Sequence, residues 1–234
     1  MTSASFPDPS APDPSAPNPS APNPSAQYEG QFGPFEITAT DRREVVIYRA
    51  GLATAAVSFG LGVTLLLLGG PTPPILTALT PLFVFFWLGL GVSLRYIHIY
   101  LRVLHQALQI FWLVGGLATA AIAGLFPQPL ALTVYQQPLT ILGVGFTFAA
   151  LTGIFFKEAF CFNRFETKLL TPLVPLLLLG HLSGLLSVSV EQGLLGAWAV
   201  LFSVFALRKG WQAIPPDIGD KSVFTYLAQQ RTAA

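Results

Sequence analysis

Only 10% of the 234 residues are charged, whereas 53% are hydrophobic and the mean hydropathy is +0.62. A soluble domain carries about 25% charged residues, so this composition excludes a water-exposed surface over most of the chain and predicts an all-α bundle of membrane helices in a lipid bilayer. The net charge of +1 gives no basis for a nucleic acid partner, and the single cysteine, Cys161, excludes an internal disulfide.

The first predicted segment is a tail of repeats. Residues 7–26 are four tandem pentads, PDPSA, PDPSA, PNPSA and PNPSA. Proline at this density removes backbone donors and fixes φ, so we expect residues 1–27 to be a disordered, polyproline-like spacer. A docking site for a proline-binding module is the alternative.

Residues 28–49 are interpreted as a cytoplasmic juxtamembrane segment. Phe32, Phe35 and Ile37 are interleaved with polar residues, which predicts a short extended piece packed on the cytoplasmic face of the bundle. Asp41 followed by Glu44 is typical of a capping box with Asp41 as the N-cap. The first helix is therefore expected to begin there.

Six apolar runs predict a transmembrane domain over residues 50–211. They are Ala50–Gly70, Ile75–Leu94, Ala107–Phe126, Pro138–Phe156, Leu169–Val190 and Gly193–Leu207. A spanning helix needs roughly 20 apolar residues, and the sixth run has only 15. We expect Arg208 and Lys209 to snorkel and so lengthen it. Residues 212–234 are then a cytoplasmic tail.

The basic residues indicate the orientation of the spans. All 12 Lys and Arg precede the first span, follow the sixth, or lie between spans two and three or four and five. The loops 70–74, 127–137 and 189–192 contain none. Because cytoplasmic loops carry an excess of basic residues, this alternation predicts a multi-pass protein with both termini in the cytoplasm.

A polar stripe follows the second predicted span. Its members are Arg95, His98, Arg102, His105 and Gln109, spaced at steps of three and four, which predicts one face of a helix that extends beyond the bilayer. An interfacial amphipathic helix is one interpretation. A polar wall that holds an anionic ligand or a partner is another. A metal site at His98 and His105 is not favoured, because no third ligand is evident.

The loop between spans four and five, residues 157–168, mixes both signs of charge with three phenylalanines. We expect Glu158 and Glu166 to form ion pairs with Arg95 and Arg102 across the cytoplasmic face. A proton or substrate relay through the two carboxylates is the alternative.

His181 is predicted to be the ionisable group nearest to the middle of the membrane. Gly180 and Gly184 flank it and indicate a small-residue face for close helix packing, across which His181 can hydrogen-bond. Axial binding of a pigment and a proton relay are the functional alternatives.

Two short matching runs suggest an internal repeat. Leu79-Thr80-Pro81-Leu82 in span two resembles Leu170-Thr171-Pro172-Leu173 in span five, as an inverted repeat of two three-helix halves would place them.

Enzyme motifs are absent from the sequence, which does not favour an enzyme. No catalytic, cofactor-binding or metal-binding residue is assigned, and no cofactor is expected. The candidate functional residues are His181, Glu158, Glu166, Arg95, His98, Arg102 and His105.

Several runs resemble a known family. They are Gln31–Thr38, Asp41–Leu52, Phe156–Phe162 with Glu166–Lys168, and Leu179–His181. The chain is similar, over about Tyr28 to Trp211, to an uncharacterised integral membrane protein family of cyanobacteria and plastids, known as domain of unknown function 2301 and as the plastid hypothetical reading frame 36 type.

The resemblance implies a photosynthetic membrane, thylakoid or plasma membrane, and a role in the assembly or support of its complexes. The polar residues of the cytoplasmic face suggest a protein partner there. It supplies no site residues. A small transporter or channel built from two three-helix halves is the alternative.

Overall fold

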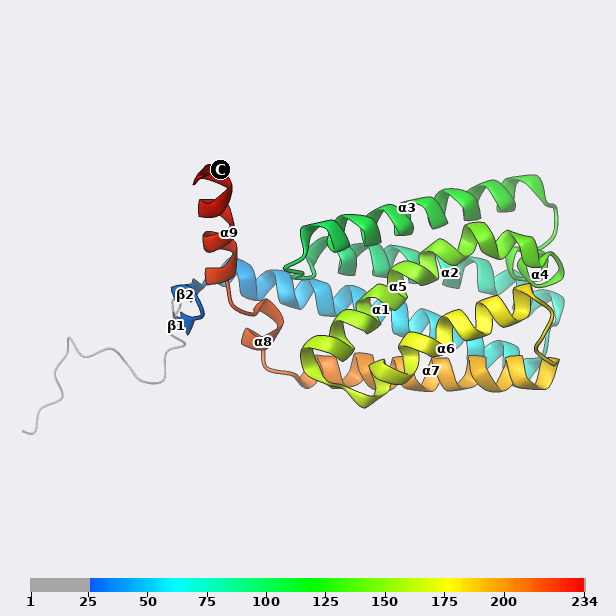
Figure 1. Ribbon diagram of the computed structural model, residues 1–234. Helices are drawn as coiled ribbons and strands as arrows, with labels where there is room; N and C mark the ends of the chain where they lie inside the picture. The colour runs from blue at the N-terminus through cyan, green and yellow to red at the C-terminus, as the bar shows by residue number, and fades with distance from the viewer. Residues whose placement is uncertain (1–25, 234) are drawn as a thin grey trace, which may run out of the picture.

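The computed structural model describes residues 26–233, which form a bundle of long helices with a small module at one end (Figure 1). The long helices are α1 (Ala39–Gly69), α2 (Pro73–Tyr96), α3 (Arg102–Leu125), α5 (Ile141–Phe162), α6 (Phe165–Leu182) and α7 (Val188–Trp211). Within the described residues these six are long and apolar enough to cross a membrane. The predicted all-α bundle of about six spans is confirmed, while nearly all of the predicted spacer lies outside the described residues.

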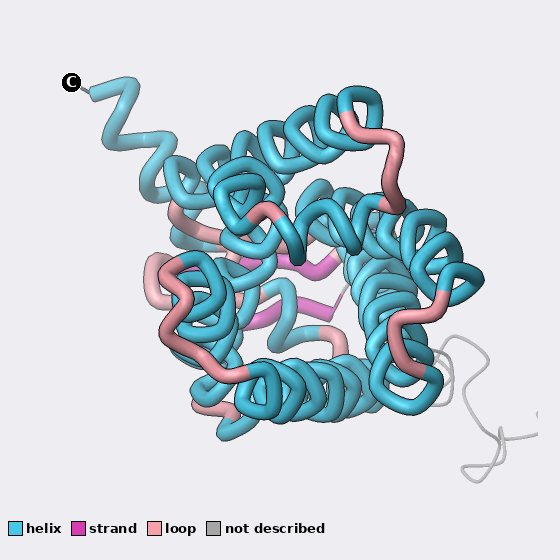
Figure 2. Tube along the Cα trace, turned by 90° about the vertical axis from the view of Figure 1, so that its right-hand side faces the viewer, coloured by secondary structure: helices cyan, strands magenta, loops and turns pink. Residues whose placement is uncertain are grey.

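The long helices form a ring in chain order. Each packs against the next one along the chain, and α7 packs against α1 (Figure 2). The short α4 (Leu130–Gln136) and the 3-10 turn η1 (Pro138–Thr140) connect α3 to α5. A two-fold axis in the membrane plane reverses the circular order of helices seen along the membrane normal. In a ring whose helices follow chain order, this rotation therefore cannot superimpose α1–α3 on α5–α7. The inverted repeat predicted from the two matching runs is wrong.

The module is built from the two ends of the described chain. Strands β1 (Ala26–Gly30) and β2 (Gly33–Ile37) pair as an antiparallel hairpin, with Ala26 opposite Ile37. Helices α8 (Pro215–Ile218) and α9 (Ser222–Ala233) follow α7. Figure 1 shows the hairpin, α8 and α9 at the same end of the bundle, as an even number of spans requires. We call this the hairpin end.

The hairpin continues directly into α1. Thr38 is the N-cap of that helix: its hydroxyl accepts a hydrogen bond from the Asp41 N–H at 3.2 Å, and its own N–H donates to Asp41 Oδ2 at 2.8 Å. The prediction of Asp41 as the N-cap is thus wrong by three residues, because Asp41 supplies the carboxylate of the box. Ile37 is buried against Val45 and Ile218, which packs the extended segment onto the bundle.

The polar stripe from Arg95 to Gln109 does not lie on one helix. Helix α2 ends at Tyr96 and α3 begins at Arg102, so a non-helical turn separates the predicted members. His105 Nε2 lies 2.6 Å from the Leu94 carbonyl oxygen, and the Gln109 amide donates to the same oxygen at 3.2 Å. These side chains satisfy the Leu94 carbonyl in place of the helical N–H four residues on, so the helix ends and the predicted amphipathic helix is wrong.

The turn between the last two spans lies earlier than predicted. Gly184 has φ +67°, and the N–H groups of Ser183, Gly184 and Leu185 donate to carbonyls of the last turn of α6. Such a left-handed glycine ends a helix. The predicted span Leu169–Val190 therefore stops at Leu182, and α7 is 24 residues long rather than short. The predicted glycine face is also wrong, because Gly184 lies in the turn.

Candidate functional site

A buried ionic network joins four helices at the hairpin end. Lys209 of α7 is 0% exposed, and its ammonium donates to Glu158 Oε2 at 2.6 Å and to Asp217 Oδ1 at 2.5 Å. Glu158 of α5 also accepts from Lys157 at 2.9 Å and from the Tyr48 hydroxyl of α1 at 3.3 Å. The expectation that Lys209 snorkels outward is therefore wrong, because two carboxylates hold its ammonium inside the bundle.

Arg49 completes this network from α1. Its guanidinium donates to Asp217 Oδ2 through Nε at 2.9 Å and Nη2 at 2.7 Å. It also donates to the carbonyls of Gln212 and Ala213, in the segment between α7 and α8. A planar guanidinium suits this forked contact. The chain that leaves α7 is thus bonded back onto α1.

The ring of Phe162 covers the network from the end of α5. The Lys209 ammonium lies 4.2 Å from its ring centroid, and the Lys157 ammonium lies 5.2 Å away. Both distances are within the range of a cation–π contact. We define the ionic network as Tyr48, Arg49, Lys157, Glu158, Lys209 and Asp217.

The predicted partners of the two loop carboxylates are wrong. Glu158 belongs to the ionic network, and Glu166 accepts from Arg208 at 2.7 Å and lies 3.5 Å from Arg164. The guanidinium of Arg95 instead lies 5.7 Å from the Tyr96 ring. Arg95 and Arg102 are on α2 and α3, whereas the basic partners of the two carboxylates lie on α5, on α7 and at the N-cap of α6.

The network is suited to holding structure together. Removing one partner from a buried pair leaves an uncompensated charge and costs about 3–5 kcal/mol. Here each carboxylate has two basic partners, and Lys209 is shared between them, so two carboxylates face three cationic groups. The arrangement fixes α8 against the bundle and leaves these carboxylates engaged.

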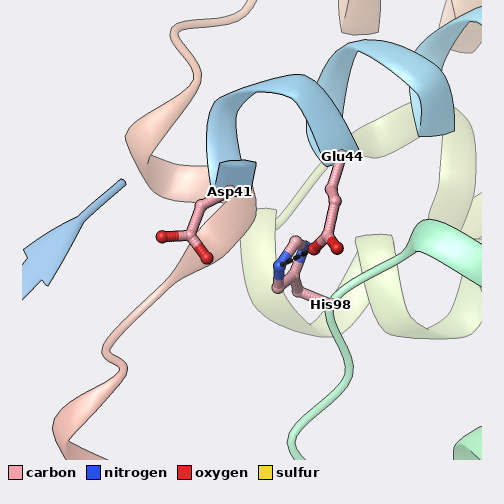
Figure 3. A group of neighbouring side chains, drawn as sticks. All are labelled: Asp41, Glu44 and His98. Atoms are coloured by element: carbon pink, nitrogen blue, oxygen red, sulfur yellow. Dashed lines mark ion pairs between the residues drawn. The ribbon is translucent and has the colours of Figure 1, made fainter. Parts of the chain in front are cut away.

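A second cluster combines Asp41, Glu44 and His98 near the start of α1 (Figure 3). One ligand atom from each lies within 4.8 Å of the others, and His98 Nε2 is 3.4 Å from Glu44 Oε2. Carboxylate and imidazole groups are ligands that a divalent metal accepts. Lys221 supplies a cation here, because its ammonium donates to Asp41 Oδ2 at 2.7 Å. His98 is paired with Glu44, whereas His105 Nε2 lies against the Leu94 carbonyl oxygen, so the two rings have different partners.

Burial lowers the pKa of His98, and the neighbouring carboxylates of Glu44 and Asp41 oppose that shift. The ammonium groups of Lys157 and Lys221 lower this pKa further. The neutral ring is therefore favoured in the folded protein.

An apolar cavity of about 510 Å³ lies at the end of the bundle opposite the hairpin end. Helices α1, α2, α4, α5, α6 and α7 all contribute to its wall. Its lining is almost entirely aliphatic and aromatic. The polar exceptions are Ser58, Tyr135, His181, Glu191 and Gln192.

His181 lies at the mouth of this cavity, in the last turn of α6. Its Nδ1 is 2.6 Å from Glu191 Oε1 of α7, and its Nε2 is 3.1 Å from the Tyr135 carbonyl oxygen of α4. The Tyr135 ring stacks on the imidazole at 4.9 Å. Predicting His181 near mid-membrane was wrong, because the helix ends one residue later. Both nitrogens face acceptors, so the geometry leaves neither for axial binding of a pigment.

Several residues of these sites were missed from the sequence. Asp217, Arg49 and Glu191 carry ion pairs, and each partner lies on another element. Two signals were present. The first is Asp217, an acidic residue that follows two adjacent basic residues, Arg208 and Lys209, for which no acidic partner was predicted. The second is Glu191, which lies ten residues after His181, beyond Gly184.

Six apolar helices around a buried core define the class of a multi-pass integral membrane protein. The model of an uncharacterised integral membrane protein family, DUF2301, matches residues 92–226, and the chain belongs to this family. The match begins later and ends later than the resemblance suggested. It includes Glu158, Lys209, Asp217 and His181, whereas Arg49 and Tyr48 precede it. No curated protein and no solved structure is significantly similar to the chain.

Proposed function

We propose that the protein is a non-catalytic membrane adaptor that assembles or supports larger complexes by binding a protein partner at its hairpin end. We further propose that this end is cytoplasmic and that the membrane is a thylakoid or plasma membrane of a cyanobacterium or plastid. The positions of the 12 basic residues support the orientation, and the resemblance described above supports the membrane.

An exposed aromatic surface on the module carries this proposal. Phe32 of the hairpin stacks on Tyr226 of α9 with ring centroids 4.0 Å apart, although the two residues are 44% and 37% exposed. Phe224 of α9 stacks on Tyr100 at 5.2 Å, and both are also exposed. The Phe32–Tyr226 pair, which we call the aromatic surface, and the Phe224–Tyr100 pair both lie outside the six spanning helices. Aromatic groups exposed to water mark binding surfaces, where they contribute much of the affinity.

The fixed position of the aromatic surface supports the same function. Asp220 Oδ2 accepts from the Gln31 N–H at 2.6 Å, and the Ser222 hydroxyl accepts from the Phe32 N–H at 3.0 Å. The hairpin is therefore bonded to the start of α9, and the ionic network bonds α8 to the bundle. A rigid surface loses less conformational entropy when a partner binds.

Copurification with a matched pair of variants tests this function. Isolation in a mild detergent should yield a heteromeric complex of defined mass from the wild type. The variant Phe32→Ser with Tyr226→Ser should lose that complex while keeping its unfolding midpoint. Leu185→Ser changes an 82% exposed residue at the opposite end and should keep the complex. A wild type that purifies only with copies of itself would contradict the proposal.

A small transporter or channel is the second candidate, and the cavity near His181 favours it. Fully buried Phe155, Phe202 and Phe205 fill the bundle between the cavity and the hairpin end, which opposes a continuous path. Solute flux into vesicles that contain only this protein, abolished by His181→Ala, would support transport over the adaptor. Unchanged permeability of those vesicles would dismiss it.

A further inference from the structure

The cavity has the dimensions of a single lipid chain. Its wall on α1 extends from Ser58 to Gly70, and twelve residues of helix rise about 18 Å. One leaflet of a bilayer is about 15 Å of hydrocarbon, half of the roughly 30 Å core. The volume of about 510 Å³ is within the roughly 300–1,000 Å³ of ligand pockets. An extended apolar chain therefore fits along the cavity.

Ser58 lies at the deep end of the cavity. Ser58 is only 8% exposed and lines the cavity between apolar side chains. Among residues 26–233 its hydroxyl has no hydrogen-bond partner, whereas Thr54 and Thr64 on the same helix donate to carbonyls four residues back. The residue therefore borders space that a ligand can occupy.

The mouth determines the chemistry of the head. His181 and Glu191 pair with each other there, and the Gln192 amide lies beside them. The cavity lining contains no Lys or Arg among the residues that the structure describes, so an anionic head would lack a counter-charge. Both ring nitrogens of His181 already have partners, so the Gln192 amide and the Glu191 carboxylate are the groups left to bind a hydroxyl or carbonyl.

We propose that the cavity binds one membrane amphiphile, with its linear apolar chain inside the bundle and an uncharged, hydrogen-bonding head at Glu191 and Gln192. The chain is either the acyl chain of a glycerolipid or an isoprenoid. This site is separate from the aromatic surface, and its occupancy does not depend on a protein partner.

A glycine in the wall provides a variant that fills the cavity. A Cβ atom on Gly145 of α5 meets only its own helix, 3.5 Å from Ile141. Gly145→Leu therefore adds a side chain at the cavity wall, and its Cβ meets no clash. Gly124→Leu is the matched control, because nothing lies within 4 Å of a Cβ there and the residue does not line the cavity. Ser58→Leu narrows the same cavity from α1 and serves if Gly145→Leu does not fold.

The test is saturation binding of tritiated 1-monopalmitoylglycerol, farnesol and palmitate to the purified protein, with native mass spectrometry of the protein and its bound lipid. We expect one molecule of monopalmitoylglycerol or farnesol per chain, and whichever binds tighter identifies the chain type. Gly145→Leu or Ser58→Leu should weaken binding at least tenfold, and Gly124→Leu should not. Non-saturable binding, equal binding to Gly145→Leu, or tighter binding of palmitate than of both uncharged probes would overturn the proposal.

Discussion

Replacing Lys209 with methionine should destabilise the protein more than the loss of any single exposed charge. The substitution keeps an unbranched side chain but removes the ammonium that bridges Glu158 and Asp217 at 2.6 and 2.5 Å. Breaking a buried pair costs about 3–5 kcal/mol. Lys157 and Arg49 still answer the two carboxylates, so we expect a loss near the lower limit, about 3 kcal/mol.

The matched control is Lys221→Met, which removes a 31% exposed ammonium from Asp41. Exposed pairs contribute up to about 1 kcal/mol. The assay is unfolding of each purified variant in detergent micelles by titration with a denaturing detergent, followed by tryptophan fluorescence. The double variant Lys209→Met with Glu158→Gln should recover part of the loss, because it also removes a buried charge. Equal stabilities of Lys209→Met and Lys221→Met would refute the structural role of the network.

Three other predictions concern helix packing, pH and the opposite end. Gly89→Ala should lower the unfolding free energy by about 1–3 kcal/mol, because the new Cβ would lie 2.7 Å from the Gly51 carbonyl oxygen. Gly124→Ala, where nothing lies near the Cβ, should have no such cost. Equal effects of the two variants in the same unfolding assay would argue against the close contact of α1 and α2. The pKa of His98 is lower in the folded protein than its usual value of 6.5. As the pH falls below 6.5, the unfolded chain therefore takes up a proton at His98 more readily than the folded protein, and the free energy of unfolding falls. The unfolding midpoint of the wild type should thus fall more between about pH 7.5 and 5 than that of His98→Gln, and parallel curves would dismiss this role. His181→Ala should leave the heteromeric complex intact on native gels. Loss of the complex in this variant would place the partner at the end of the bundle opposite the hairpin end.

The spans could be predicted because lipid imposes a simple requirement on sequence. A helix in hydrocarbon must be long and apolar, and basic residues collect at one side, so the six spans follow from local composition. Helix ends were less predictable. The turn after Tyr96 contains neither Gly nor Pro, and side chains from α3 satisfy the Leu94 carbonyl there. A contact between two helices has no signature within either one.

The candidate site was predictable only in its residue types. Glu158 was singled out in a charged loop and His181 in an apolar span, but the partners of neither were predicted. Glu158 pairs with a lysine 51 residues away, and His181 with a glutamate across a turn that was placed too late. Ion pairs depend on how helices are arranged around the ring, which a single sequence does not specify. The cavity near Ser58 arises from the same arrangement.

Site-specific photocrosslinking tests the proposed partner surface most directly. A photoreactive phenylalanine analogue placed at Tyr226 lies on the aromatic surface, and one at Leu185 lies at the opposite end of the bundle. Irradiation of intact membranes should give a single discrete heteromeric product from position 226 and none from position 185. The absence of a product at position 226, or the same product from both positions, would contradict the proposal that the hairpin end binds the partner.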